Sequence, residues 1–286
     1  MKIIHAVTSL DKGGAENHVI LLSSEQKKKN NEIFIFVSKN SFYWLNFLKK
    51  SKIEVFKPSF FKENNLFFKI YKFFKDIIFL KNLIEKKKPD VLHAHLPYME
   101  LVSYFSLRFS VYKPKFIITK HVDSDFFYGS ITQQKTYFGS LVAKIISFKA
   151  DKIIAISKAV KKYLIFGKFG IEKKKIKHIY YGLDSLKYNN KKDFKLKKKN
   201  FIKNYIVLGC IARLVPQKSI ENLIISLSYL KKFKIKLIIV GNGPLKNKLK
   251  NLSKELKVSD QIIWIDFLDD VRKFYNFIDI FVLTSL

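Results

Sequence analysis

Short segments that are apolar almost throughout alternate with longer segments of helical period along nearly the whole sequence. A strand that is apolar on both faces is typical of a parallel sheet, because helices then cover both faces. Each parallel strand also needs a crossover to reach the next one, and that crossover is usually a helix. The alternation therefore predicts an α/β fold built from doubly wound parallel sheets.

The predicted elements fall into two sets. The first set of strands is Lys2–Val7, Ile33–Val37, Val91–Ala94, Phe116–Thr119, Lys152–Ile156 and Lys177–Tyr180. The second set is Tyr205–Ala212, Lys236–Val240, Gln261–Ile265 and Ile280–Leu283. The helices predicted between them are Ala15–Lys29, Leu66–Lys87, Met99–Phe109, Gln133–Phe148, Ser219–Lys232 and Leu245–Leu256.

The alternation breaks once, between Ser185 and Asn204, where eight lysines occur without periodicity. Such a stretch is typical of a solvated linker. We therefore predict a first domain over residues 1–184, a linker over 185–204 and a second domain over 205–286. Because only four strands follow the linker and Ile280–Leu283 is expected to be a buried strand just before Leu286, we expect the second domain to be incomplete.

The chain is strongly basic, with 55 Lys and Arg against 23 Asp and Glu and a formal net charge of +32. Only Arg108, Arg213 and Arg272 are arginines, so the excess is lysine spread along the chain. Proteins that recognise nucleic-acid bases favour the planar guanidinium of arginine, so the scarcity of arginine argues against a nucleic-acid partner. A lysine excess together with abundant Ile, Asn and Phe is typical of A/T-biased coding, which is the ordinary interpretation of this charge. The charge would still attract the chain to an anionic membrane surface.

Cysteine content and hydropathy bear on location. Cys210 is the only cysteine, and no apolar run approaches the roughly 18 residues of a membrane span. The apolar residues before Asp11 are too few for a signal peptide. We therefore expect a cytoplasmic protein, with peripheral membrane contact left open.

Two glycine-containing loops join a predicted strand to a predicted helix. Gly13 and Gly14 precede the first helix, and Gly241, Gly243 and Pro244 follow the strand that ends at residue 240. Glycine lets backbone N–H groups approach an anion, and a helix N-terminus favours negative charge. A tight turn that binds nothing is the alternative for both loops. The first loop lacks the G-x-G-x-x-G spacing of a dinucleotide fingerprint.

A third loop carries two cations. Arg213 follows a predicted strand, and Lys218 comes directly before the helix predicted to begin at Ser219. An arginine that can bind two oxygens, a point charge and a helix N-terminus together favour a diphosphate site. The alternative is a solvated loop, but an arginine is scarce enough here to favour function.

Leu66–Ile84 predicts a basic amphipathic helix. Such helices can lie on anionic membranes, although packing against the sheet is the ordinary alternative. The residues expected to share one apolar stripe are Phe67, Ile70, Phe74, Ile77 and Ile78, with Lys69, Lys72 and Lys75 at every third position.

Several motifs occur in an order that resembles the retaining GT-B glycosyltransferases of family 4. They are Gly13-Gly14-Ala15-Glu16, Asp151–Ser157, Tyr181–Asp184, the Arg213 and Lys218 pair, Gly241–Leu245 and Phe267–Val271. Tyr181 stands where that family usually has asparagine.

The resemblance implies a two-domain GT-B-like enzyme that moves a sugar from a nucleotide-sugar donor to a glycolipid or polysaccharide acceptor with retention. It implies no cofactor, since the nucleotide-sugar is a substrate, and no metal, since Arg213 and Lys218 would hold the diphosphate and stabilise the leaving phosphate. It also implies catalytic roles for His121, Arg213 and Lys218, and places Glu16 and His121 on the acceptor side. The implied donor-binding residues are Gly13, Gly14, Arg213, Lys218, Gly241, Gly243 and Pro244.

Two short patterns in the sequence could suggest a metal site, but neither predicts one. His93 and His95 alternate along a strand and share a face, but the sequence offers no recognisable third ligand, so no zinc site is expected. Asp123 and Asp125 match the D-x-D pattern of metal-dependent GT-A transferases, which the two-domain layout opposes.

Family members follow the equivalent of Phe281–Leu286 with a Glu-x7-Glu motif that this sequence does not contain. Two functions from different classes therefore stay open beside the transferase. One is an inactive fragment that only binds the donor or a membrane, and the other, disfavoured by scarce arginine, is a basic nucleic-acid-binding protein.

Overall fold

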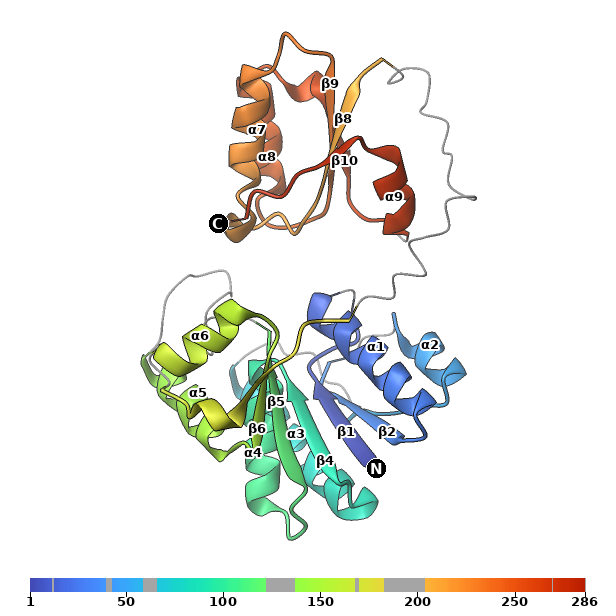
Figure 1. Cartoon of the computed structure of the whole chain (residues 1–286), viewed down its shortest axis with the longest axis vertical. Coiled ribbons are helices and arrows are strands. Elements are labelled where there is room, and N and C mark those ends of the chain that lie inside the picture. The colour runs from blue at the N-terminus through green and yellow to red at the C-terminus, as the bar shows by residue number, and fades with distance from the viewer. Residues whose placement is uncertain are drawn as a thin grey trace. The chain divides into compact units, whose positions relative to one another are not determined.

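A computed structural model describes residues 1–11, 13–39, 43–58, 66–121, 137–167, 170–182, 204–268 and 270–285. The chain divides into two compact units, Met1–Gly182 and Leu183–Leu286 (Figure 1). Each unit is α/β, as predicted. The predicted boundary at residue 184, the linker up to residue 203 and the Asp123–Asp125 motif lie outside the described residues.

The first unit contains a seven-stranded sheet in the order β3-β2-β1-β4-β5-β6-β7. All of its strand pairs are parallel. Its strands are β1 (Lys2–Val7), β2 (Glu32–Val37), β3 (Glu54–Phe56), β4 (Val91–His95), β5 (Lys115–Lys120), β6 (Lys152–Ala155) and β7 (Ile176–His178). Its helices are α1 (Gly14–Lys28), α2 (Leu45–Lys50), α3 (Leu66–Lys87), α4 (Pro97–Phe109), α5 (Tyr137–Lys149) and α6 (Lys158–Phe166).

The strand order reverses at β1. The chain builds outward from β1 through β2 to β3, and α3 then returns it to β4 on the other side of β1. Helices α1 and α2 cover one face of the sheet, and α3 to α6 pack on the other. In β1, Ile4 and Ala6 belong to the core beneath α3 to α6, whereas Ile3 and Val7 belong to the core beneath α1 and α2. Apolar residues on both faces of β1 explain why its sequence shows no alternation.

The elements that the sequence did not predict are short. Strand β3 has three residues, and α2 and α9 (Val271–Phe277) have six and seven. None is long enough to show a period of its own. Helix α6 was also missed, although Ser157 caps it by accepting a hydrogen bond from the N–H of Val160 at 3.1 Å.

Helix α3 has the predicted bounds but not the predicted single stripe. Ile77 is buried with Leu80 and Ile84 against the sheet, whereas the other stripe residues are exposed. Asp76 is also buried, and the Lys72 ammonium and the Tyr98 hydroxyl both donate to its Oδ2, at 2.9 and 2.8 Å. Paired in this way, a buried carboxylate holds α3 against α4. The exposed members are Phe67, Ile70, Phe74 and Ile78.

The second unit contains a smaller, four-stranded sheet in the order β10-β9-β8-β11, with every pair parallel. Helices α7 and α8 share one core beside the sheet, and α9 lies on its other face (Figure 1). The strands are β8 (Ile206–Ile211), β9 (Ile235–Val240), β10 (Ile262–Ile265) and β11 (Ile280–Phe281), and the remaining helices are α7 (Ile220–Tyr229) and α8 (Lys246–Glu255).

Strand β11 differs from its prediction. It has only two residues and lies at the edge of the sheet, where Ile280 and Phe281 are 52% and 41% exposed. The apolar run Ile280–Leu283 thus correctly predicts a strand, but the prediction that this strand is buried is wrong. Composition alone does not say whether an edge strand is covered by other elements. Separately, none of the described helices is both long and apolar enough to cross a membrane.

Gly209 lets α9 approach β8. A Cβ atom at this position would lie 2.6 Å from Phe274 Cζ and 2.6 Å from Ile278 Cγ2. We expect Gly209→Val to lower the free energy of unfolding of the second unit by about 1–3 kcal/mol, because overpacking moves the helix or the strand. Urea unfolding followed by the fluorescence of Trp264, in a Trp44→Phe background, measures this unit alone.

Asn251→Val is the matched control for this prediction, since Asn251 is exposed on α8 in the same unit. An unchanged urea midpoint for Gly209→Val would show that α9 does not pack on β8 as described.

Candidate functional site

Each sheet has one point where the strand order reverses, between β1 and β4 in the first unit and between β8 and β11 in the second. Ligands of open α/β sheets bind beyond the carboxyl ends of the strands at such points. The described candidate residues follow β1, β5, β8 or β9, so they lie at the carboxyl ends of the strands in their unit.

In the second unit, the loops after β8 and β11 are tied together. Arg213 is exposed after β8, and the Lys218 ammonium donates to Ser285 Oγ at 3.3 Å. The Thr284 hydroxyl lies 3.1 Å from the carbonyl oxygen of Lys218 and 2.9 Å from that of Ser219. The segment after β11 is therefore fixed to the start of α7.

This part of the second unit is positive. Neither Arg213 nor Lys218 forms an ion pair with a described residue, and the N-terminus of α7 adds the positive end of a helix dipole. The nearby Glu221 is paired with Lys248 at 2.8 Å instead. Two cations and a helix N-terminus that meet no acidic partner among the described residues can bind an anion with several oxygens, such as a diphosphate.

The glycines after β9 serve backbone packing. Gly241 has a φ of 151°, and a Cβ atom there would lie 1.9 Å from the carbonyl oxygen of Ala212. A Cβ atom at Gly243 would lie 2.4 Å from the carbonyl oxygen of Leu214, and Pro244 lies before α8 rather than in its first turn. The loop after β9 thus packs closely against the backbone of the Arg213 loop. Donor binding by Gly241, Gly243 and Pro244 stays a prediction.

In the first unit, the N-terminus of α1 already holds a carboxylate. Gly13 is the N-cap residue, and the side chain of Glu16 folds back so that its Oε2 would lie 1.9 Å from a Cβ atom at Gly13. The Ser9 hydroxyl donates to Glu16 Oε1 at 3.0 Å. A bound anion would compete with Glu16 here, so anion binding by Gly13 and Gly14 stays a prediction.

Five of the six histidines gather at the carboxyl ends of β1, β4 and β5, beneath α1. The register of β1 and β4 places His5 opposite His93, and the rings of His93 and His95 are 4.1 Å apart between centroids. His18 on α1 and His121 after β5 complete the cluster.

His5 was missed by the sequence analysis. It supplies the third residue that His93 and His95 were predicted to lack, and one ring nitrogen from each of the three lies within 4.8 Å of the others. The available signal was a histidine inside an otherwise apolar strand. What the sequence could not give was the register that sets His5 beside His93.

His121 contacts two of its neighbours directly. Its Nε2 lies 3.4 Å from His95 Nδ1, and its Nδ1 is hydrogen-bonded to the Tyr181 hydroxyl. Tyr181 stacks on His18 with 4.2 Å between ring centroids. The structure thus joins His121 to Tyr181, the position that departs from the family pattern, and brings the charge of Glu16 close enough to act on Tyr181.

Burial dominates the electrostatics of this cluster. It lowers the pKa of His5 to about 4. Burial, followed by the charges of His18 and Lys120, lowers the pKa of His121 to about 3. Burial and then the negative charge of Glu16 raise the pKa of Tyr181 to about 12. At neutral pH the cluster therefore contains neutral imidazoles and a protonated phenol.

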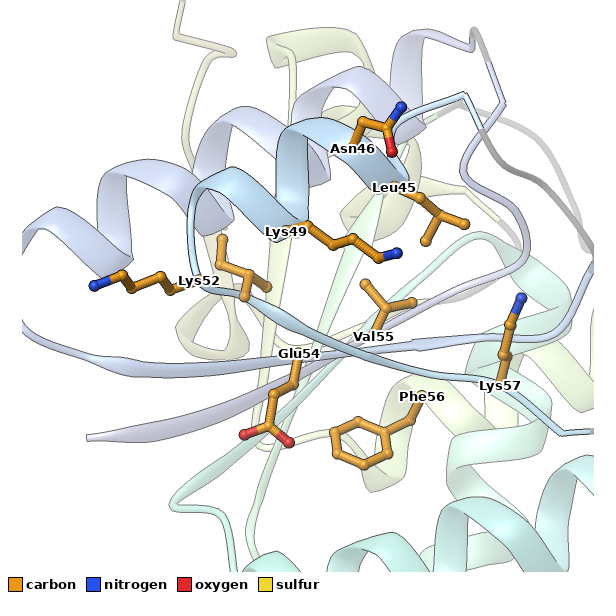
Figure 2. Close-up of a pocket in the computed structure, with 9 residues that line it drawn as sticks. Leu45, Asn46, Lys49, Lys52, Glu54, Val55, Phe56 and Lys57 are labelled. Atoms are coloured by element: carbon orange, nitrogen blue, oxygen red, sulfur yellow. The ribbon is translucent and has the colours of Figure 1, made fainter.

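A surface pocket of about 820 Å³ lies elsewhere, between α2 and the edge strand β3 (Figure 2). Its lining includes Lys49, Lys52, Lys57, Glu54 and Phe56. It is two strands away from β1 and contains none of the predicted site residues. We therefore do not assign the candidate site to this pocket.

The histidine cluster makes the first unit sensitive to acid. The unfolded chain takes up protons near pH 6.5, whereas folded His5 and His121 do so only near pH 4 and 3. The contribution of these histidines to the free energy of unfolding is therefore fully present above pH 6.5. Between pH 6.5 and the folded pKa it falls as the pH drops, by up to roughly 1.4 kcal/mol per pH unit for each histidine. In a Trp264→Phe background, where the fluorescence of Trp44 reports the first unit alone, we expect a clearly lower urea midpoint at pH 5 than at pH 7.

His121→Gln should reduce this pH dependence by up to one proton's contribution. Equal midpoints at the two pH values would contradict the buried, neutral state of the cluster.

Similar proteins agree with this description. The glycosyltransferase from Rickettsia africae ESF-5 has a TM-score of 0.75 at 20% identity, over 99% of this chain and 73% of its own. The Anabaena HepE structure with UDP and glucose has a TM-score of 0.78 at 19% identity, over 100% of this chain and 74% of its own. These structures show that the fold is the GT-B fold, as predicted.

The E. coli O-antigen biosynthesis glycosyltransferase WclY is 34% identical over 181 residues, which are 60% of this chain and 48% of that protein. The matched region thus spans about half the length of this relative. Residues 12–185 match the model of Glycosyltransferase Family 4, and residues 191–286 match that of the Glycosyl transferases group 1. The chain belongs to Glycosyltransferase Family 4.

Proposed function

We propose that this chain transfers a sugar from a nucleotide-sugar donor to a glycolipid or polysaccharide acceptor. The observation that carries the proposal is the positive loop of Arg213 and Lys218 at the strand-order reversal of the second sheet, where neither cation forms an ion pair with a described residue. HepE, which shares the fold, has been solved with UDP and with UDP-glucose, and WclY is named for O-antigen biosynthesis. Retention of the anomeric configuration stays a prediction.

In this proposal the second unit binds the donor diphosphate. Arg213 donates two hydrogen bonds to phosphate oxygens, Lys218 adds a point charge, and the N–H groups at the start of α7 complete the site. The same cations stabilise the charge that develops on the leaving phosphate as the glycosidic bond breaks. They supply the positive charge that a metal ion would otherwise give, so the proposal includes neither a metal nor a cofactor.

The first unit, with His121 and Glu16, is proposed to bind the transferred sugar and the acceptor. His121 is neutral and half-buried, and its partner Tyr181 keeps its proton. Neutral hydrogen-bonding groups in a partly buried site suit sugar hydroxyls, whereas free cations suit phosphates. The cations of the second unit thus suit the charged diphosphate of a nucleotide-sugar, and the neutral groups of the first unit suit its uncharged sugar.

We expect Arg213→Ala to weaken binding of UDP or GDP by roughly 1.5–3 kcal/mol, the scale of a hydrogen bond to a charged group. By the same reasoning, Lys218→Met should weaken it as well. Isothermal titration calorimetry on the whole chain, with EDTA present, measures both the affinity and its independence of metal.

Lys232→Ala is the matched control. Lys232 is an exposed lysine between α7 and β9, so it lies at the amino ends of the strands, away from Arg213 at their carboxyl ends. Equal affinities for the Arg213→Ala variant and the unaltered chain would remove Arg213 from the donor site. A strict requirement for Mg²⁺ would overturn the metal-free form of the proposal.

We further propose that α3 contacts an anionic membrane surface, consistent with a cytoplasmic protein that binds membranes peripherally. Phe67, Ile70, Phe74 and Ile78 follow one another at helical spacing and are each 49–71% exposed. Lys69 is exposed on the same helix, in a chain of net charge +32. An apolar stripe with lysines beside it can insert its rings at the lipid boundary while the cations meet anionic headgroups.

We expect the chain to co-sediment with vesicles that contain phosphatidylglycerol, less as salt rises, and not with vesicles of phosphatidylcholine alone. The double change Phe67→Ser and Phe74→Ser should weaken binding, since burying each phenylalanine contributes roughly 1.5–3 kcal/mol. Phe166→Ser is the control, because Phe166 is 79% exposed and lies on α6. Equal binding to both kinds of vesicle would reject the electrostatic contribution.

A further inference from the structure

Five side chains of the first unit form one continuous series of hydrogen bonds, here called the histidine chain. Gln26 Oε1 lies 2.7 Å from His5 Nε2, and His5 Nδ1 lies 3.1 Å from His95 Nε2. His95 Nδ1 then lies 3.4 Å from His121 Nε2, and His121 Nδ1 meets the Tyr181 hydroxyl. Both ring nitrogens of all three histidines are used within the series.

The direction of donation along the histidine chain follows from its two ends. The structure turns the side-chain oxygen of Gln26, rather than its NH2 group, toward His5 Nε2, and in this orientation an oxygen can only accept, so His5 donates through Nε2–H. A neutral imidazole has one N–H, so His5 Nδ1 must then accept from His95 Nε2–H. The Tyr181 hydroxyl can both donate and accept, so it does not oppose whatever direction Gln26 sets.

We propose that Gln26, His5 and His95 are positioning residues that fix His121 as its Nε2–H tautomer and so make Tyr181 donate its hydroxyl proton to His121 Nδ1. With its proton engaged, the Tyr181 hydroxyl can act only as an acceptor toward a ligand, through the lone pairs of its oxygen at the carboxyl ends of the strands. There it accepts a hydrogen bond from a hydroxyl group of the sugar. This last step rests on the proposed function, whereas the tautomers do not.

The surroundings hold this arrangement in place. The imidazoles of His5 and His95 are fully buried, and desolvation keeps both neutral, so each retains a single N–H. His18 lies flat against the Tyr181 ring, with an interplanar angle of 21°. The raised pKa of Tyr181 keeps its hydroxyl protonated as a donor.

Two other uses of these residues fit the geometry less well. A metal held through His5 Nδ1 and His95 Nε2, together with His93, would have to break the 3.1 Å contact between those two nitrogens. A proton relay would need a titratable group at its inner end, and the chain ends there on the amide of Gln26.

Nuclear magnetic resonance of the full chain with ¹⁵N-labelled histidine tests the proposal without any ligand, because protonated and unprotonated ring nitrogens resonate far apart. Single His→Gln variants assign the signals. At pH 7 we expect His5, His95 and His121 to be Nε2–H tautomers. Gln26→Glu, which keeps an acceptor at this position, should leave all three unchanged.

Gln26→Lys should reverse the histidine chain, because an ammonium group can only donate. His5, His95 and His121 should then all switch to the Nδ1–H tautomer, while His178 on β7, outside the histidine chain, should keep its tautomer. If the lysine variant does not fold, Gln26→Leu takes its place. Removal of the acceptor should then leave a mixture of tautomers at His121.

Three results would overturn the proposal: a Nδ1–H tautomer of His121 in the unaltered chain, an unchanged tautomer of His121 in the folded lysine or leucine variant, or one metal ion per purified chain bound to His5, His93 and His95. Nucleotide binding by Arg213 is measured separately. A failure of the histidine chain is therefore distinguishable from a failure of the proposed function.

Discussion

The pairing of β1 with β4 is the contact on which the arrangement of the first unit depends. The chain leaves β1 for β2 and β3, and only the return through α3 brings β4 to the other side of β1. This return places His5 opposite His93, although the two are far apart in the sequence. It also puts the carboxyl ends of β1, β4 and β5 side by side, and the histidine chain connects those three ends.

The second unit repeats the reversal with a different chemical result. Strand β11 returns beside β8, and the hydroxyl of Thr284 then fixes the segment after it to the backbone at Lys218. The second unit thus carries an exposed, positively charged loop, whereas the first unit carries partly buried neutral imidazoles and a protonated phenol at its reversal. One topological rule therefore positions both groups of residues, and in the proposed function the residues after each strand decide whether a phosphate or an uncharged hydroxyl is bound.

Much of the fold could be predicted from the sequence because the strands are apolar on both faces, as in β1 and β9. The loop of Arg213 and Lys218 could be located because its residues adjoin a predicted strand and helix. The contacts within the histidine cluster could not, since they depend on the register between strands, as for His5 and His93. Strand β3 could not either, because its three residues pair only through β2.

His5 shows why such a cluster has to be complete. An imidazole at a fully buried position loses its hydration, and each nitrogen left without a partner would be destabilising by roughly 1–3 kcal/mol. Apolar neighbours cannot supply those partners, so Gln26 on α1 and His95 on β4 must do so. His95 is also fully buried, so its second ring nitrogen needs a partner as well. His121, at the carboxyl end of β5, supplies that partner. The hydrogen bonds that buried His5 requires therefore extend through His95 as far as His121, at the carboxyl ends of the strands. That is also the position of the proposed sugar site.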